Sequence, residues 1–129
     1  MELTAIRDLK EKIEDTKWEL LMLNSRMETI QADLIGVPLS KATAQLVENL
    51  ATRITDTQNK HAKLIEELSR ESEELAKQIS QRVKGNAARV LYRRYILCET
   101  FKEIASAMNY SEHNIYHLHR QGVRSFSQI

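Results

Sequence analysis

The chain has 129 residues, which is enough for one ordinary domain or for a small domain with an extension. Glycine (3), proline (1) and aromatic residues (5%) are scarce, a composition that is typical of long helices and leaves little turn chemistry for a sheet. The net charge of +1 hides an asymmetry, because residues 1–81 carry 11 basic and 15 acidic side chains (net −4) and residues 82–129 carry 8 and 3 (net +5). We therefore expect any polyanion to meet the second part of the chain.

Composition also excludes several classes of protein. No apolar run is longer than Leu20–Leu23, so we expect no membrane span, and residues 1–12 lack the apolar segment of a secretory signal. The single cysteine, Cys98, cannot form an internal disulfide. These features predict a cytoplasmic protein that is not attached to a membrane.

The first third of the chain follows a heptad pattern. Apolar residues recur every seven positions, and a second set follows three residues after each of the first four, in the manner of a coiled-coil seam. The two sets are Ile6, Ile13, Leu20, Met27 and Leu34, and Leu9, Thr16, Leu23 and Ile30. The helix should stop at Gly36-Val37-Pro38, and Ser40 can cap a second helix that runs to Gly85-Asn86. The stripe of that second helix is Val47, Leu50, Ile54, Thr57, His61, Leu64, Leu68, Leu75 and Ile79.

Two long helices joined by a short loop predict an antiparallel hairpin, which buries one seam and is marginal alone. We expect a homodimer that forms a four-helix bundle, and the alternative is a monomeric arm packed on its own head or on a partner. The residues assigned to oligomerisation are the apolar seam positions Ile6, Leu9, Ile13, Leu20, Leu23, Met27, Ile30, Leu34, Val47, Leu50, Ile54, Leu64 and Leu68. Trp18 and Leu21 lie off the seam and indicate a second contact face, and His61 on the seam is expected to fix register.

The stretch FKEIASAMNYSEHNIYHLHR, residues 101–120, predicts two helices and a turn. Thr100 and Glu103 have the spacing of a capping box, and Phe101, Ile104, Ala105 and Met108 then share one face of a helix. Asn109 tolerates the left-handed conformation and should end that helix, while Tyr110 packs at the corner. Ser111 can cap the next helix, in which Ile115 and Leu118 point inward. This order of residues is the helix-turn-helix pattern.

A further helix is expected over Ala87–Leu97, capped by Asn86, with Val90, Leu91, Ile96 and Leu97 closing a small three-helix core. The predicted fold class is all-α, a long antiparallel helical hairpin followed by a carboxy-terminal three-helix domain. The expected domains are residues 1–84 for oligomerisation and residues 85–129 for DNA binding.

With Ile115 and Leu118 inward, the outward side chains of the second helix have the chemistry that reads base edges in the major groove of double-stranded DNA. These base-reading candidates are Glu112, His113, Tyr116, His117 and Arg120. The phosphate-contact candidates around them are Arg89, Arg93, Arg94, Lys102, Ser111 and Arg124. The alternatives are a helix-turn-helix used for protein contact and, for any single residue, a solvated face.

These residues carry a resemblance. The motifs are LYRRYI at residues 91–96, EIA at 103–105, and Tyr110-Ser111 followed by Ile115-Tyr116 and His119. They resemble region four of bacterial sigma factors, and more closely the ArpU- and RinA-type regulators of Gram-positive phages and prophages. The resemblance implies control of late phage genes, with DNA contacts from the helix after Ser111. Asn109 replaces the usual turn glycine, and Gln121-Gly122 interrupts the basic tail of the family.

No segment resembles the promoter-melting region of a sigma factor, so the resemblance implies that the protein recruits, assists or blocks host RNA polymerase. Two other functions are weighed beside this one, a DNA-packaging protein of the small-terminase kind and a helical regulator that binds protein only. His113 and His117 share a helical face, but two ligands are too few for a metal site, so no metal and no cofactor are expected. No phosphate-binding glycine loop or activated nucleophile is present, and an enzyme is not expected.

Overall fold

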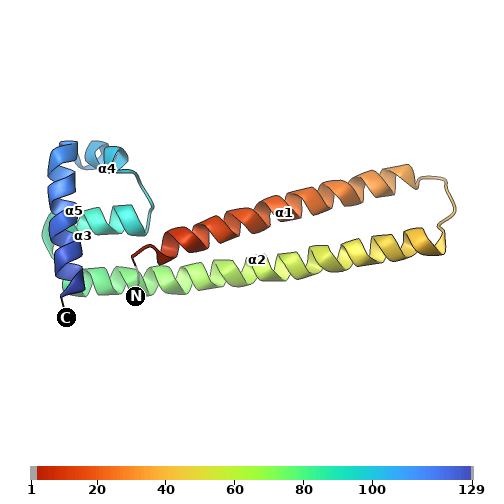
Figure 1. Cartoon of the computed structure of the whole chain (residues 1–129), viewed down its shortest axis with the longest axis horizontal. Helices are drawn as coiled ribbons and strands as arrows, with labels where there is room; N and C mark the ends of the chain where they lie inside the picture. Colours follow the sequence, from red (N-terminus) through yellow and green to blue (C-terminus); the bar gives the residue numbers. More distant parts are fainter. Residues whose placement is uncertain (1–2, 129) are drawn as a thin grey trace. The chain divides into compact units, whose positions relative to one another are not determined.

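The computed structural model describes residues 3–128, and every regular element in that range is an α-helix (Figure 1). The helices are α1 (Ala5–Asp33), α2 (Lys41–Arg82), α3 (Gly85–Tyr95), α4 (Phe101–Met108) and α5 (Glu112–Ser127). The predicted all-α class is confirmed. None of the described helices combines the length and the apolar character that crossing a membrane requires.

The chain packs as two compact units, which are described separately. Residues 10–66 form one, called the hairpin unit below. The other, called the head unit, combines the chain up to Leu9 with the chain from Glu67 onward. Because α1 and α2 each contribute to both units, this division does not coincide with the predicted boundary after residue 84.

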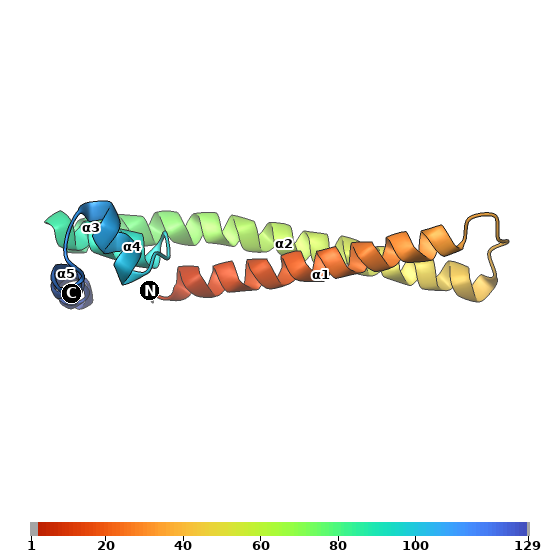
Figure 2. The same cartoon turned by 90° about the horizontal axis from the view of Figure 1, so that it is seen from above.

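In the hairpin unit α1 and α2 run antiparallel, side by side (Figures 1 and 2). The connection after α1 contains Gly36, whose φ of 76° is the left-handed conformation that favours glycine. Ser40 then caps α2, since its Oγ accepts a hydrogen bond of 3.1 Å from the backbone N–H of Thr43. The predicted stop and restart of the chain are both confirmed.

The seam of the hairpin unit is closed by the residues that the heptad pattern selects. Leu23 and Leu50 are buried, as are the seam threonines Thr16 and Thr57. The other seam residues of this unit are half-buried: Ile13, Leu20, Met27, Ile30, Leu34, Val47, Ile54, His61 and Leu64. The sequence assigned the apolar members of this set to oligomerisation, whereas the structure turns them towards the seam of the same chain. Because most of them are only half-buried, their assignment to oligomerisation stays a prediction.

A polar pair lies within this seam. The hydroxyl of Thr16 donates to the Ile13 carbonyl at 2.8 Å and lies 2.6 Å from Nδ1 of His61. Because the single hydroxyl proton is directed at the carbonyl, Nδ1–H of His61 is the donor to the Thr16 oxygen. A polar pair that meets only in one alignment of the helices favours one register, as expected for His61.

The head unit contains the larger core. One cluster joins α1, α2, α3 and α5 through Ile6, Leu75, Ile79, Val83, Ala87, Leu91, Ile96 and Phe126. The predicted domain boundary after residue 84 divides this cluster, because the heptad pattern does not reveal that the ends of the long helices pack on the short ones. Three predicted oligomerisation residues therefore belong to the head unit. Ile6 is part of this cluster, Leu68 packs at its edge, and Leu9 is also buried in this unit.

A second cluster holds the helix-turn-helix together. Val90 of α3, Ile104 and Ala105 of α4 and Ile115 of α5 are buried against one another. Leu118 packs against both clusters and links them.

Two details of α3 correct the prediction. This helix covers Gly85–Tyr95 and not Ala87–Leu97, and Leu97 is 46% exposed because it follows the end of the helix. Asn86 does not cap it, because Lys84 occupies the cap position. The side-chain amide of Asn86 donates instead to the Tyr110 hydroxyl at 2.7 Å.

Candidate nucleic-acid interface

The start of α4 is fixed by the predicted capping box. The Thr100 hydroxyl accepts from the backbone N–H of Glu103 at 3.1 Å, and the Glu103 carboxylate accepts from the backbone N–H of Thr100 at 3.1 Å. Hydrogen bonding to Thr100 lowers the pKa of Glu103 below its ordinary value, and the bond from the Thr100 backbone N–H is the largest cause. The free N–H groups of the helix end are thereby used inside the motif.

The turn between α4 and α5 is the one that the sequence predicts. Asn109 has φ 57° and ψ 42°, which is the left-handed conformation. The backbone N–H of Tyr110 donates to the Ala105 carbonyl at 3.0 Å and closes the end of α4. Ser111 then caps α5, since its Oγ accepts from the backbone N–H of Asn114 at 3.1 Å. Residues 101–120 therefore form two helices joined by a fixed bend and not one continuous helix.

The bend determines which side of α5 is exposed. Ile115 is completely buried and Leu118 is half-buried, so the inward residues are those predicted. All five predicted base-reading side chains are exposed: Glu112, His113, Tyr116, His117 and Arg120. They share the outward face of one helix, as direct readout from a major groove requires. Glu112 also lies in the first turn of α5, where its negative charge interacts favourably with the positive end of the helix dipole.

Aromatic rings connect this face to α4. The ring of Phe101 lies 4.6 Å from that of Tyr116 and 5.0 Å from that of His119, measured between centroids. The guanidinium of Arg94 lies 4.5 Å from the centroid of the Phe101 ring. Tyr116 is therefore held against α4 while 48% exposed, which restricts its ring more than that of a free surface tyrosine.

Behind these rings Tyr95 and His119 form a hydrogen bond of 2.6 Å between Oη and Nε2. Burial raises the pKa of Tyr95, so its phenol remains protonated and donates to Nε2. Burial, and secondly the nearby Arg94 charge, lower the pKa of His119, which remains neutral and accepts. Nothing in the sequence motif indicates that these residues, 24 positions apart, meet, so no role was predicted for the pair.

Two of the predicted phosphate contacts already have partners within the chain. Arg93 forms an ion pair with Glu99 at 2.8 Å, and Arg94 donates to the Glu99 carbonyl at 3.0 Å. Both arginines are half-buried and hold the loop before α4, in which Cys98 has φ 58°. Both arginines thus have a structural role in this loop, and their assignment to phosphate contacts stays a prediction. Residue type alone does not reveal that Arg93 and Arg94 are half-buried or that both contact Glu99.

The other phosphate candidates are exposed: Arg89, Lys102, Ser111 and Arg124. Lys102 lies in the first turn of α4, and Arg124 lines a shallow hollow on α5 together with Arg120 and Tyr116. Ser111 presents an exposed hydroxyl whose oxygen already serves the cap. Lys102 and Arg124 are exposed on α4 and α5, as a contact with phosphate requires.

The carboxy-terminal half of α5 was not fully anticipated. A Cβ on Gly122 would lie 2.9 Å from Cγ of Leu91, so this glycine allows α5 to approach α3 closely. Phe126 is buried beneath Arg82, whose guanidinium lies 5.0 Å from the ring centroid and donates to the Phe126 carbonyl at 3.2 Å. The spacing from Leu118 to Gly122 to Phe126 is four and four, a helical signal that extends the predicted inward stripe to the end of the helix.

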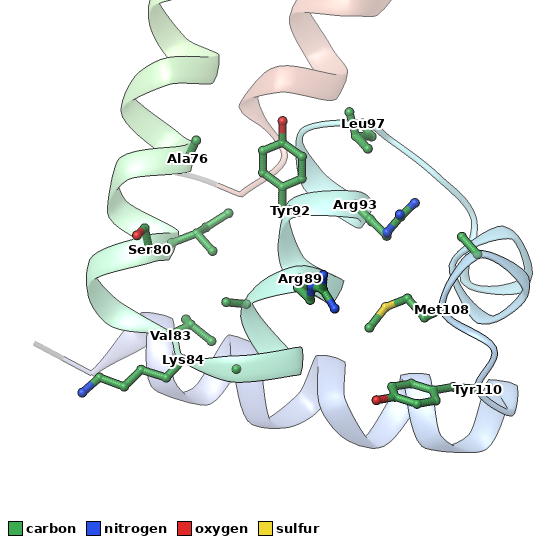
Figure 3. Close-up of a pocket in the computed structure, with 14 residues that line it drawn as sticks. Ala76, Ser80, Val83, Lys84, Arg89, Tyr92, Arg93, Leu97, Met108 and Tyr110 are labelled. Atoms are coloured by element: carbon green, nitrogen blue, oxygen red, sulfur yellow. The ribbon is translucent and has the colours of Figure 1, made fainter.

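Arg89 lines a different hollow, a groove of about 720 Å³ (Figure 3). Its apolar lining comes from α2, α3 and the end of α4 and includes Ile79, Tyr92 and Met108. The side chains of Arg89, Tyr92 and Arg93 project into it from α3 (Figure 3). No acidic side chain lines this groove within the described residues.

No protein-family model matches the chain, and neither a curated protein nor a solved structure matches it. Across residues 3–128 no three or more His, Cys, Asp or Glu side chains are grouped so that they could hold a metal ion. His113 and His117 remain an exposed pair on α5.

Proposed function

We propose that the protein is a sequence-specific regulator of transcription that binds double-stranded DNA through α5. In this proposal it is encoded by a phage or prophage, acts in the cytoplasm of the bacterial host as a homodimer, and activates a late operon by assisting or recruiting RNA polymerase. Glu112, His113, Tyr116, His117 and Arg120 read base edges, while Lys102 and Arg124 contact phosphates. Arg89 is a third phosphate candidate.

The left-handed bend at Asn109 is the observation that carries the proposal. It separates two capped helices, and it leaves five polar side chains together on the exposed face of α5. Basic residues outnumber acidic ones by 8 to 3 from Arg82 onward, which favours a polyanionic partner. The motifs shared with ArpU- and RinA-type regulators and with region four of sigma factors point to the same use of α5.

The test is selection of duplexes by the purified full chain, followed by affinity measurement at fixed salt by fluorescence anisotropy. Arg120→Ala and His117→Ala should each weaken binding of the selected duplex by about 1–3 kcal/mol per lost base contact, or roughly 5- to 150-fold. Arg53, an exposed arginine of the hairpin unit, provides the matched control, and Arg53→Ala should leave the affinity unchanged. The proposal fails if no duplex is retained at low salt, and the reading face is misassigned if neither α5 variant differs from the wild type.

The groove of Figure 3 favours a second candidate, a regulator that binds protein only. Its apolar lining resembles a peptide-binding groove more than a phosphate-binding surface. This candidate would be favoured over the first if the purified chain binds no duplex and if Arg120→Ala leaves the fluorescence anisotropy of every duplex unchanged.

A further inference from the structure

α1 carries a second stripe on the face opposite the seam. Its members follow one another at helical spacings of three or four residues, apart from one adjacent pair, over about 20 Å of helix. They are Trp18, Leu21, Met22, Ser25, Thr29 and Ala32. The three large side chains are 58%, 55% and 71% exposed, in chain order. The charged residues of this segment, such as Arg26 and Glu28, lie beside the stripe and not within it.

The stripe is less polar than its composition suggests. The Thr29 hydroxyl donates to the Ser25 carbonyl at 3.0 Å, so it is satisfied within the helix. The corresponding outer face of α2 is polar and includes Glu48, Thr52, Thr55, Asn59 and Glu66. Of the two long helices of the hairpin unit, α1 therefore has apolar side chains both on its seam and on its outer face, whereas α2 has them on its seam and a polar outer face.

The hairpin unit also lacks a core of its own. Among residues 10–66, all of them described, Leu23 and Leu50 are the two buried apolar side chains. Two helices that bury so little apolar surface are marginal in water, and a further helical layer is the usual remedy. A surface of large apolar side chains on the outer face of α1 is where such a layer would pack.

We infer that this stripe binds the same stripe of a second copy of the chain, with the two α1 helices antiparallel about a two-fold axis at Ser25. In that register Trp18 faces Ala32 of the second copy, Leu21 faces its Thr29, and Ser25 faces its own equivalent. Trp18 and Leu21 thus meet smaller side chains, Met22 comes opposite Glu28 at the edge of the stripe, and the smallest separation falls where the two serines meet. A self-complementary surface of this kind is what an isologous dimer requires.

The inference rests on the self-association included in the proposed function, and cross-linking without DNA tests it. In a Cys98→Ser background, Ser25→Cys should form a disulfide-linked dimer on oxidation with diamide, because a disulfide needs Cα atoms within about 7 Å. Asn59→Cys, on the exposed outer face of α2, is the matched control and should remain largely uncross-linked. By light scattering, the wild type should have twice the chain mass of 15.0 kDa.

Trp18→Glu is the disrupting variant. Its side chain is 58% exposed, so the helical circular dichroism should be unchanged while the mass falls to that of the monomer. The inference is overturned by a monomeric wild type, by equal cross-linking at residues 25 and 59, or by a dimer that survives Trp18→Glu. A wild-type dimer that retains no duplex would contradict the DNA-binding proposal and leave this interface standing.

Discussion

The hairpin unit and the head unit use similar helices in opposite ways. In the hairpin unit, two of the four buried seam residues are threonines, and most of the seam is half-buried. In the head unit, three short helices and the ends of two long ones enclose two clusters with completely buried members such as Leu91, Ile104 and Ile115. The hairpin unit depends on the heptad pattern of its two helices. The head unit depends in addition on the bend at Asn109, the helix caps Thr100 and Ser111, and the close contact of Gly122 with Leu91. The head is therefore expected to be the more stable unit, and the hairpin the one that depends on a partner.

The largest expected effect concerns core truncation. Ile104→Ala should lower the free energy of unfolding of the head unit by about 2–5 kcal/mol, because a completely buried side chain leaves a cavity when it is shortened. Ile54→Ala, at a half-buried seam position, should cost clearly less, because water can replace the lost methyl groups. Amide hydrogen exchange measured residue by residue would assign each loss to its unit. Equal losses at the two positions would remove the distinction between the units.

Helix caps give a smaller test of the same comparison. Thr100→Ala removes the side-chain half of the α4 capping box, and Ser40→Ala removes the single cap of α2. Loss of such a cap costs about 0.5–2 kcal/mol. Thr100→Ala should lie towards the upper end, because α4 is short and its neighbours in the head depend on its position, whereas a long α2 can fray by a turn. Urea unfolding of each variant, followed by circular dichroism, measures the two costs, and a larger loss for Ser40→Ala would contradict the reasoning.

Much of the fold follows from the sequence because its signals are local. The heptad seam, the stop at Gly36, the capping box at Thr100 and the bend at Asn109 each depend on residues a few positions apart. The domain boundary and the use of Arg93 and Arg94 depend on which distant elements meet, and residue type does not encode that. One practical consequence is that a fragment beginning at residue 85 would lack Leu75, Ile79 and Val83, which belong to the core of the head unit.

Within the candidate site, exposure of the five α5 residues could be predicted, because Ile115 and Leu118 fix the inward face by helical spacing. The hydrogen bond between Tyr95 and His119 could not, since it joins α3 to α5 through the tertiary fold. The same holds for Gly122, whose importance appears only once Leu91 is placed beside it.

The smallest expected effect is a pH dependence that belongs to the head unit. Burial lowers the pKa of His119 in the folded state below the ordinary 6.5, so below about pH 6.5 the unfolded chain binds a proton that the folded chain does not. The stability that depends on neutral His119 is therefore present above pH 6.5 and is lost as the pH falls towards the lowered pKa. Urea unfolding at pH 7.5 and at pH 5 should show this loss in the wild type.

Two variants separate the causes of that pH dependence. His119→Gln can still accept from the Tyr95 hydroxyl but does not titrate in this range, so the loss at acid pH should shrink. Tyr95→Phe keeps a buried His119 beside Arg94, so it should lower stability at pH 7.5 while the pH dependence remains, because burial and not the hydrogen bond is the main cause of the lowered pKa. If His119→Gln loses as much stability at pH 5 as the wild type, the acid sensitivity arises from another group.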